Sequence, residues 1–193
     1  MIMKTCKRLS GHYSEHCAFA MYLLLSIFIF ILLAAGSVPA YAQGSTIPRR
    51  AIMSAMEGSV LVQAAGQAVA VPARKNMEIK NGDRVITGND GTCELRYDDG
   101  SVSRIGPNSR VDISALSRTE ADGSETTVLN VKRGSIWNNT KEVVKRNSRF
   151  EVNTPAAAAS VRGTQFYINV ESFLDTIVRV YTGLVGLAPA PED

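Results

Sequence analysis

Apolar residues in the later part of the chain recur at every other position in short runs, and glycine, asparagine and aspartate separate the runs. Period-two alternation predicts strands that bury one face, joined by turns. After residue 42 there is no apolar stripe of helical spacing over ten or more residues. The pattern therefore predicts a single all-β domain over residues 57–187, a mainly antiparallel sandwich or roll of short strands. The alternating residues that define the predicted strands are Val60, Val62, Val69, Val71, Val85, Cys93, Leu95, Tyr97, Val111, Ile113, Leu129, Val131, Phe150, Val152, Phe166, Ile168, Val170, Val178 and Val180.

Short segments flank the predicted domain. Residues 43–56 begin as a polar lead containing Pro48 and are predicted to be a linker, and residues 188–193 are predicted to be a tail. Within the domain, the alanines at 156–159 follow Pro155 and fit either a brief helix or close packing between strands.

One strand departs from regular alternation. Val102 and Ile105 fall on opposite faces of a regular strand. This spacing indicates either a bulge near Ser103 and Arg104 or a strand that stops there.

Four glycines stand two residues before a β-branched residue: Gly58, Gly100, Gly134 and Gly183. We expect each to take a positive φ in a turn that starts a strand. The stretch "DDGSVSRIGPNS" (98–109) then combines a hairpin corner with a second turn a few residues later.

The first 42 residues have the pattern of a secretory signal peptide with a helical apolar centre. Basic residues precede an apolar stretch over 18–38, and Ala40 and Ala42 stand before a predicted cut at Gln43. The length of the apolar stretch leaves an uncleaved transmembrane anchor as the alternative. Both interpretations place the domain outside the cytoplasm. With cleavage the domain is periplasmic or secreted, and without cleavage it is periplasmic and anchored in the inner membrane.

Composition narrows the possible functions once this segment is set aside. It contains three of the 21 basic residues and one of the 18 acidic residues, which leaves a net charge of +1 and argues against nucleic-acid binding. It also contains both histidines and two of the three cysteines, so that Cys93 alone remains. Histidine-based catalysis and zinc or haem sites lack their residues, and we expect no enzyme activity, metal or cofactor. Cys93 is predicted to be a small buried side chain.

Several blocks in fixed order resemble the FecR-like domain, the extracytoplasmic domain named after the regulator of iron-dicitrate transport. They are "EGSVLV" (57–62), "NGDRVITG" (81–88), "CELRYDDGSVSRIGPNSRVDI" (93–113), "LNVKRGSIW" (129–137), "FEVNTP" (150–155) and "VRGTQFYINV" (161–170). The resemblance implies a β-rich domain and, in the best-known members, signalling from an outer-membrane iron-siderophore receptor to a cytoplasmic sigma factor. About 17 residues precede the apolar segment here, too few for a sigma-binding domain, so the chain is more similar to stand-alone secreted members.

The resemblance also marks a set of motif residues with a structural or binding role. They are Gly82, Asp83, Asp99, Gly100, Ser101, Gly106, Pro107, Asn108, Ser109, Gly134, Arg162, Gly163, Thr164 and Phe166. Arg162 fits either a tie between neighbouring strands through carboxylates and carbonyl oxygens or an anion-binding site. Gly163 and Thr164 are expected to provide a turn and a strand hydrogen bond.

Two further features suggest surface binding. The basic residues are concentrated at Lys132, Arg133, Lys141, Lys145, Arg146 and Arg149. They fit a solvated loop face or a contact with anionic polysaccharide or lipid head groups. Trp137 fits either the closing residue of a small core or a platform for a sugar ring.

These features predict a non-catalytic binding module that engages an envelope protein or polysaccharide, with membrane contact only through an uncleaved N-terminal segment. The alternative is a membrane-anchored sensor in signalling related to iron uptake, without an anti-sigma domain of its own. A glycosidase using Asp98 and Asp99 is a third hypothesis.

Overall fold

The computed structural model describes residues 45–142, 145–171 and 175–190, and these residues form strands and turns without an α-helix. The predicted signal peptide lies outside the described residues. The strands are β1 (Thr46–Pro48), β2 (Ala51–Glu57), β3 (Val60–Gln63), β4 (Val71–Pro72), β5 (Glu78–Ile79), β6 (Arg84–Thr87), β7 (Thr92–Tyr97), β8 (Val102–Ile105), β9 (Arg110–Thr119), β10 (Glu125–Asn139), β11 (Arg149–Asn153), β12 (Ala157–Val170) and β13 (Thr176–Pro189). The prediction of an all-β, mainly antiparallel domain is confirmed.

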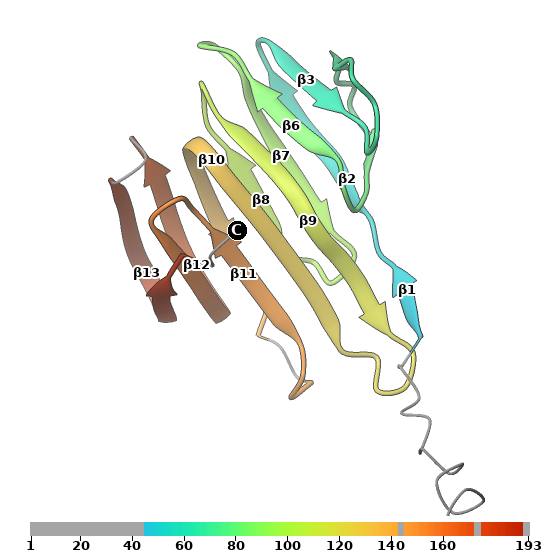
Figure 1. Cartoon of the computed structure of the whole chain (residues 1–193), viewed down its shortest axis with the longest axis vertical. Coiled ribbons are helices and arrows are strands. Elements are labelled where there is room, and N and C mark those ends of the chain that lie inside the picture. The colour runs from blue at the N-terminus through green and yellow to red at the C-terminus, as the bar shows by residue number, and fades with distance from the viewer. Residues whose placement is uncertain (1–44, 143–144, 172–174, 191–193) are drawn as a thin grey trace, which may run out of the picture. The chain divides into compact units, whose positions relative to one another are not determined.

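Strand β10 is the central strand of the sheet and pairs with four other strands. On one side, its first part pairs with β9 and its last part pairs with β8. From β9 the sheet continues through β6, β3 and β4, and from β8 it continues through β7, β2 and β5. Figure 1 shows these two branches as layers, with β3, β6 and β9 in front of β2, β7 and β8. Buried residues from both branches form one core.

The turn at Gly106–Ser109 moves the chain from one layer to the other. Strands β8 and β9 are both antiparallel to β10, so the turn between them does not reverse the chain. The Thr87 hydroxyl donates to the Gly106 carbonyl at 2.7 Å and accepts from the Ser109 amide at 2.8 Å. Asn108 has a φ of 53°. The predicted second turn is therefore present, and it redirects a strand between layers.

On the other side of β10, the sheet continues to β13. Strand β11 is parallel to the first part of β10, and β12 pairs antiparallel with β11 and with the last part of β10. Strand β13 pairs along β12 and is an edge strand. The later strands are longer than the short strands predicted, because β10, β12 and β13 each have 14 or 15 residues.

The predicted alternation places most of the core. The inward residues of β7 are Cys93, Leu95 and Tyr97, and each is at most 5% exposed. Val69 and Val71 do not follow the prediction, since both are exposed beside a two-residue edge strand. In β13, Val180 is also exposed, because no strand among the described residues pairs with the outer edge of β13.

The predicted boundaries need correction. The expected linker, residues 43–56, contains β1 and most of β2, where Ala51 and Met53 are fully buried. The expected tail begins inside β13, which ends at Pro189. Three of the four alanines after Pro155, Ala157 to Ala159, belong to a strand, because β12 starts at Ala157.

Strand β8 is regular, and neither the bulge nor the early stop predicted there is present. Ser103 and Ile105 point inward and are buried, whereas Val102 is half-buried on the other face. Its pairings with β7 and β10 run without a register shift. The alternation was not recognised in the sequence because Ser103, a polar residue, occupies an inward position.

All four predicted glycines have a positive φ. Gly58 and Gly100 lie in turns before β3 and β8, as expected. Gly183 lies inside β13 where the pairing with β12 shifts register, and Gly134 lies inside β10 directly after the shift between Val131 and Arg133. Those two glycines therefore accommodate bulges rather than starting strands.

Candidate functional site

Five side chains form a row across the outer face of the sheet. Direct cross-strand partners link Glu94 in β7 to Arg104 in β8, Arg104 to Trp137 in β10, Trp137 to Tyr167 in β12, and Tyr167 to Arg179 in β13. The chain neighbours of Glu94, Arg104, Trp137 and Tyr167 are all buried, so these side chains lie on the face away from the core. We call these five residues the outer-face row.

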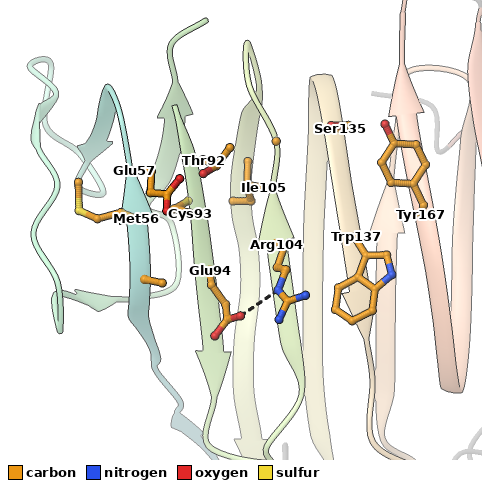
Figure 2. Close-up of a pocket in the computed structure, with 12 residues that line it drawn as sticks. Met56, Glu57, Thr92, Cys93, Glu94, Arg104, Ile105, Ser135, Trp137 and Tyr167 are labelled. Atoms are coloured by element: carbon orange, nitrogen blue, oxygen red, sulfur yellow. Dashed lines mark hydrogen bonds and ion pairs between the residues drawn. The ribbon is translucent and has the colours of Figure 1, made fainter. Parts of the chain in front are cut away.

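Charged groups of this row are arranged against its aromatic rings. The Arg104 guanidinium carbon is 5.0 Å from the Trp137 ring centroid, and that of Arg179 is 6.0 Å from the Tyr167 ring centroid. Both distances are within the range of cation–π attraction. Arg104 Nε also donates to Glu94 Oε2 at 2.9 Å, and Figure 2 shows this contact beside the Trp137 indole. Glu94 therefore holds Arg104 in position over the ring.

Glu94 is itself fixed by several donors. The Ser54 hydroxyl donates to Glu94 Oε1 at 2.6 Å, and Arg96 Nη2 lies 3.3 Å from the same oxygen. These hydrogen bonds, that from Ser54 first and that from Arg104 second, hold the pKa of the Glu94 carboxyl below its ordinary value. Glu94 is consequently ionised at neutral pH and keeps its attraction for Arg104.

Four of the five residues of the outer-face row, all except Arg179, border a groove of about 390 Å³. Its lining combines Glu94, Arg104, Trp137 and Tyr167 with parts of β2 and with Ser135. Trp137 is half-buried here, so it does not close the core as one interpretation expected. Ile136 and Asn138 occupy the core positions on either side of it. The groove offers a ligand an aromatic surface next to fixed hydrogen-bond donors.

The motif residues near the turns have structural contacts. The buried Asp83 carboxylate accepts from the backbone amides of Ala65 at 2.9 Å and Lys80 at 2.8 Å. Asp99 accepts from the Ser101 amide at 2.8 Å, which closes the turn before β8. Gly82 and Gly100 lie in the same turns, whereas Gly106, Pro107 and Ser109 lie in the turn between β8 and β9.

The last motif, Val-Arg-Gly-Thr-x-Phe, joins β12 to its neighbours. The Thr164 hydroxyl lies 2.9 Å from the carbonyl oxygens of Arg162 and Leu184, and its amide donates to the Thr140 hydroxyl at 2.9 Å. Gly163 has a φ of 55° at a bulge in the pairing of β12 with β13, and Phe166 is fully buried. Thr164 thus provides the strand hydrogen bonds expected of it, whereas Gly163 provides a bulge rather than a turn between strands.

The structure brings part of the basic group together. Arg146 and Arg149 line a second hollow together with Arg162, which the sequence analysis had treated separately. The other basic residues are exposed outside this lining: Lys132, Arg133, Lys141 and Lys145. Lys145 Nζ donates to the Asp122 carbonyl at 2.6 Å.

Sequence reasoning missed four residues of the outer-face row: Glu94, Arg104, Tyr167 and Arg179. A signal was available for two of them, because Glu94 and Arg104 stand at equal distances on either side of the Asp99 turn. Hairpin symmetry then places them opposite each other. The partners of Trp137 come from strands distant in the sequence and had no local signal.

Arg49 was also missed, since it falls in the predicted linker. Its side chain is 2% exposed, and its Nη2 lies 2.5 Å from Asp98 Oδ1 and 3.5 Å from both Asp99 Oδ2 and Glu125 Oε2. Arg118 Nη2 contacts the other Asp98 oxygen at 3.0 Å. The two aspartates that suggested a glycosidase therefore take part in an ion-pair network.

Cys93 lies in the core, as predicted. Burial raises the pKa of its thiol to about 12, so the thiol stays protonated at neutral pH.

No group of three or more side chains suited to binding a metal is found among the described residues. The same residues include no helix with the length and apolar character needed to cross a membrane.

The chain matches the family described as FecR protein over residues 83–186, and it belongs to this family. The match starts at Asp83 and includes the outer-face row and the Val-Arg-Gly-Thr motif. No curated protein and no solved structure matches the chain.

Proposed function

We propose that this protein is a non-catalytic, extracytoplasmic binding module of the bacterial envelope, and that its outer-face row holds a polysaccharide. The observation that carries the proposal is the position of Trp137, half-buried in a groove and flanked by Arg104 and Tyr167. A tryptophan held in this way presents an apolar ring surface with polar groups beside it. Sugar rings have apolar C–H faces and hydroxyl edges that match both features.

The row is arranged before any ligand arrives. Glu94 fixes Arg104 through a charge-assisted hydrogen bond, and strand pairing fixes the spacing of Trp137 and Tyr167. A ligand therefore orders few side chains when it binds, which lowers the entropy cost of binding. Arginine supplies several donors in a rigid plane, and these suit the hydroxyl or carboxylate oxygens of a glycan.

Other contacts support the absence of catalysis. Asp98 is paired with Arg49 and Arg118, and Asp99 is bonded within its own turn. The Cys93 thiol is buried and protonated at neutral pH, so it is a poor nucleophile.

Fluorescence titration tests this function, because Trp137 is the one tryptophan in the chain. Soluble chito-oligosaccharides and oligogalacturonate serve as neutral and acidic probes. We expect one of them to shift the Trp137 emission in a saturable way. Calorimetry then compares W137A, which should lose binding by at least tenfold, with Y181A as a control. Tyr181 is 61% exposed and does not line the groove. Equal binding by W137A, or no binding of either glycan, would refute the proposal.

Family membership favours a second candidate, a membrane-anchored sensor that passes an envelope signal to a separate partner. Sequencing the amino terminus of the exported protein separates the two. A start at Gln43 supports a free module, whereas an intact Met1 supports the anchored sensor.

A further inference from the structure

A second surface, distinct from the groove, is built around three arginines. Arg146 precedes β11, Arg149 is the first residue of β11, and Arg162 lies in β12. They line a hollow of about 690 Å³ together with Leu184 of β13. This hollow and the Trp137 groove have no lining residue in common. We call Arg146, Arg149, Arg162 and Leu184 the arginine hollow.

The arginines of this hollow are not neutralised by close carboxylates, in contrast to other arginines of the domain. Arg84 forms two hydrogen bonds with Asp112, at 2.5 and 2.9 Å, and the buried Arg49 meets Asp98 at 2.5 Å. By contrast, Arg162 Nη2 donates to a backbone carbonyl, that of Arg146, at 2.6 Å. This contact brings two guanidinium-bearing residues together without neutralising either.

Arg149 has a weak partner in the hollow. Its Nη1 lies 3.5 Å from Glu151 Oε2, and its side chain is 54% exposed. An exposed pair at this distance contributes little and leaves the guanidinium available. The hollow therefore keeps a positive charge that attracts an anion.

An apolar strand borders these charges. Leu184 is the direct cross-strand partner of Arg162 and is 85% exposed. Tyr181 on the same strand is 61% exposed. Across all of β13, Arg179 is the single charged residue. Exposed apolar side chains next to cations form a surface that suits an anionic, partly apolar partner.

We propose that the arginine hollow docks the domain on an anionic lipid bilayer. The three arginines bind lipid phosphates, and Leu184 enters the boundary between head groups and acyl chains. An acidic polysaccharide would match the arginines but would leave Leu184 in water. A second copy of this chain would cover Leu184 but would bring two arginine clusters close together. The bilayer is the partner that satisfies both features.

The test measures how deeply position 184 enters the membrane, using the full chain reconstituted in vesicles. In a W137F background, L184W places the one tryptophan at the hollow, and V69W places it at another exposed apolar site as a control. Vesicles contain brominated phosphatidylcholine, which quenches nearby tryptophan, with or without phosphatidylglycerol. We expect quenching of L184W that requires phosphatidylglycerol and decreases at high salt, and no quenching of V69W.

The charge contribution is tested by adding R146Q, R149Q and R162Q to the L184W chain. At about 1 kcal/mol for each arginine near the surface, the phosphatidylglycerol-dependent binding should weaken about 100-fold. An unchanged urea midpoint confirms that this variant folds. The background lacks Trp137, so a failure here leaves the proposed glycan binding untouched.

Several outcomes would overturn the proposal. One is L184W emission that the brominated lipid does not quench. The same holds if the quenching is equal in vesicles without phosphatidylglycerol, or equal in the chain that lacks the three arginines. Another is binding of soluble dextran sulfate without bilayer quenching, which would assign the hollow to an acidic polysaccharide. A third is a concentration-dependent dimer, without lipid, that shields position 184.

Discussion

Arg49 and Asp98 form an ion pair that fastens the start of the described chain to the turn between β7 and β8. Arg49 Nε donates to Asp98 Oδ1 at 2.7 Å, and Nη1 donates to the Thr127 hydroxyl at 3.1 Å. The arginine side chain is 2% exposed and that of Asp98 is 35% exposed. The cation is thus the buried member of the pair, and three carboxylates surround it.

We predict that R49M lowers the free energy of unfolding by about 2 kcal/mol. Removing one member of a buried pair usually costs 3–5 kcal/mol, but the carboxylates left here are partly hydrated, which reduces the cost. Urea unfolding followed by Trp137 emission measures the change.

The adjacent residue offers a matched control. The Arg50 side chain is 65% exposed and pairs with Glu78 at 2.7 Å. R50M should therefore change stability by less than about 0.5 kcal/mol. Equal effects of the two substitutions would contradict the special role of Arg49.

Glu94 makes the emission of Trp137 depend on pH. The pKa of Glu94 is lowered from its ordinary value of 4.5. The ionised carboxylate therefore stabilises the fold fully at pH values above 4.5, and this contribution is lost as the pH falls through the lowered pKa. We expect constant emission from pH 7 to 5 and a change below pH 4.5, when protonated Glu94 releases Arg104.

Two substitutions assign that transition. E94Q should show altered emission already at pH 7 and no acid transition. D122N should keep the transition, because the Asp122 carboxylate accepts hydrogen bonds from Ser124 and Asn147, in contacts that do not include Arg104 or Trp137. A transition that persists in E94Q would assign it to another group.

Cys93 should be unreactive in the folded domain. Its thiol is buried, and its pKa of about 12 leaves almost no thiolate at pH 8. In a C6S/C17S background, we expect Ellman's reagent to label Cys93 in urea and to leave it unlabelled in buffer over the same period. Rapid labelling in buffer would show that β7 opens.

Gly134 is predicted to be irreplaceable in β10. Its φ is +81°, and a Cβ at this position would lie 2.5 Å from Ser109 Cα. G134A should therefore cost at least about 3 kcal/mol, from the left-handed backbone and from the displaced turn. Urea unfolding measures the loss.

Gly66 separates those two contributions. It has a φ of +71°, but a Cβ there would meet no atom within 4 Å. G66A should cost about 1–2 kcal/mol from backbone strain alone. If G134A cost no more than G66A, the close approach of Ser109 would be unimportant.

The sequence predicted strands well where period-two alternation was regular. Cys93, Leu95 and Tyr97 point inward as expected. The same reasoning failed to orient β10 around Trp137, because Ile136 and Asn138 share the inward face and Asn138 is polar. The Ser103 hydroxyl donates to Asn138 Oδ1 at 2.6 Å, so a long-range hydrogen bond accompanies the burial of that amide. A contact of this kind has no local signal.

The candidate site was predicted only in part for a similar reason. Trp137 and Arg162 were identified from their residue types, whereas their neighbours depend on strand pairing over long separations. Tyr167 faces Trp137 only because β12 returns beside β10 after the β11 strand. Arg49 was hidden for another reason, since one of two adjacent arginines after Pro48 is indistinguishable in the sequence from a solvated linker residue.

Fastening of residues 46–50 fixes the point where the preceding chain enters the domain. Thr46 to Pro48 pair with the end of β9, and Arg49 is held directly afterwards. Force applied to the chain before residue 46 would act first on these strand and ion-pair contacts. It would reach the Trp137 groove only after they had broken. The pairing of residues 46–50 therefore shields the Trp137 groove from force applied to the preceding chain.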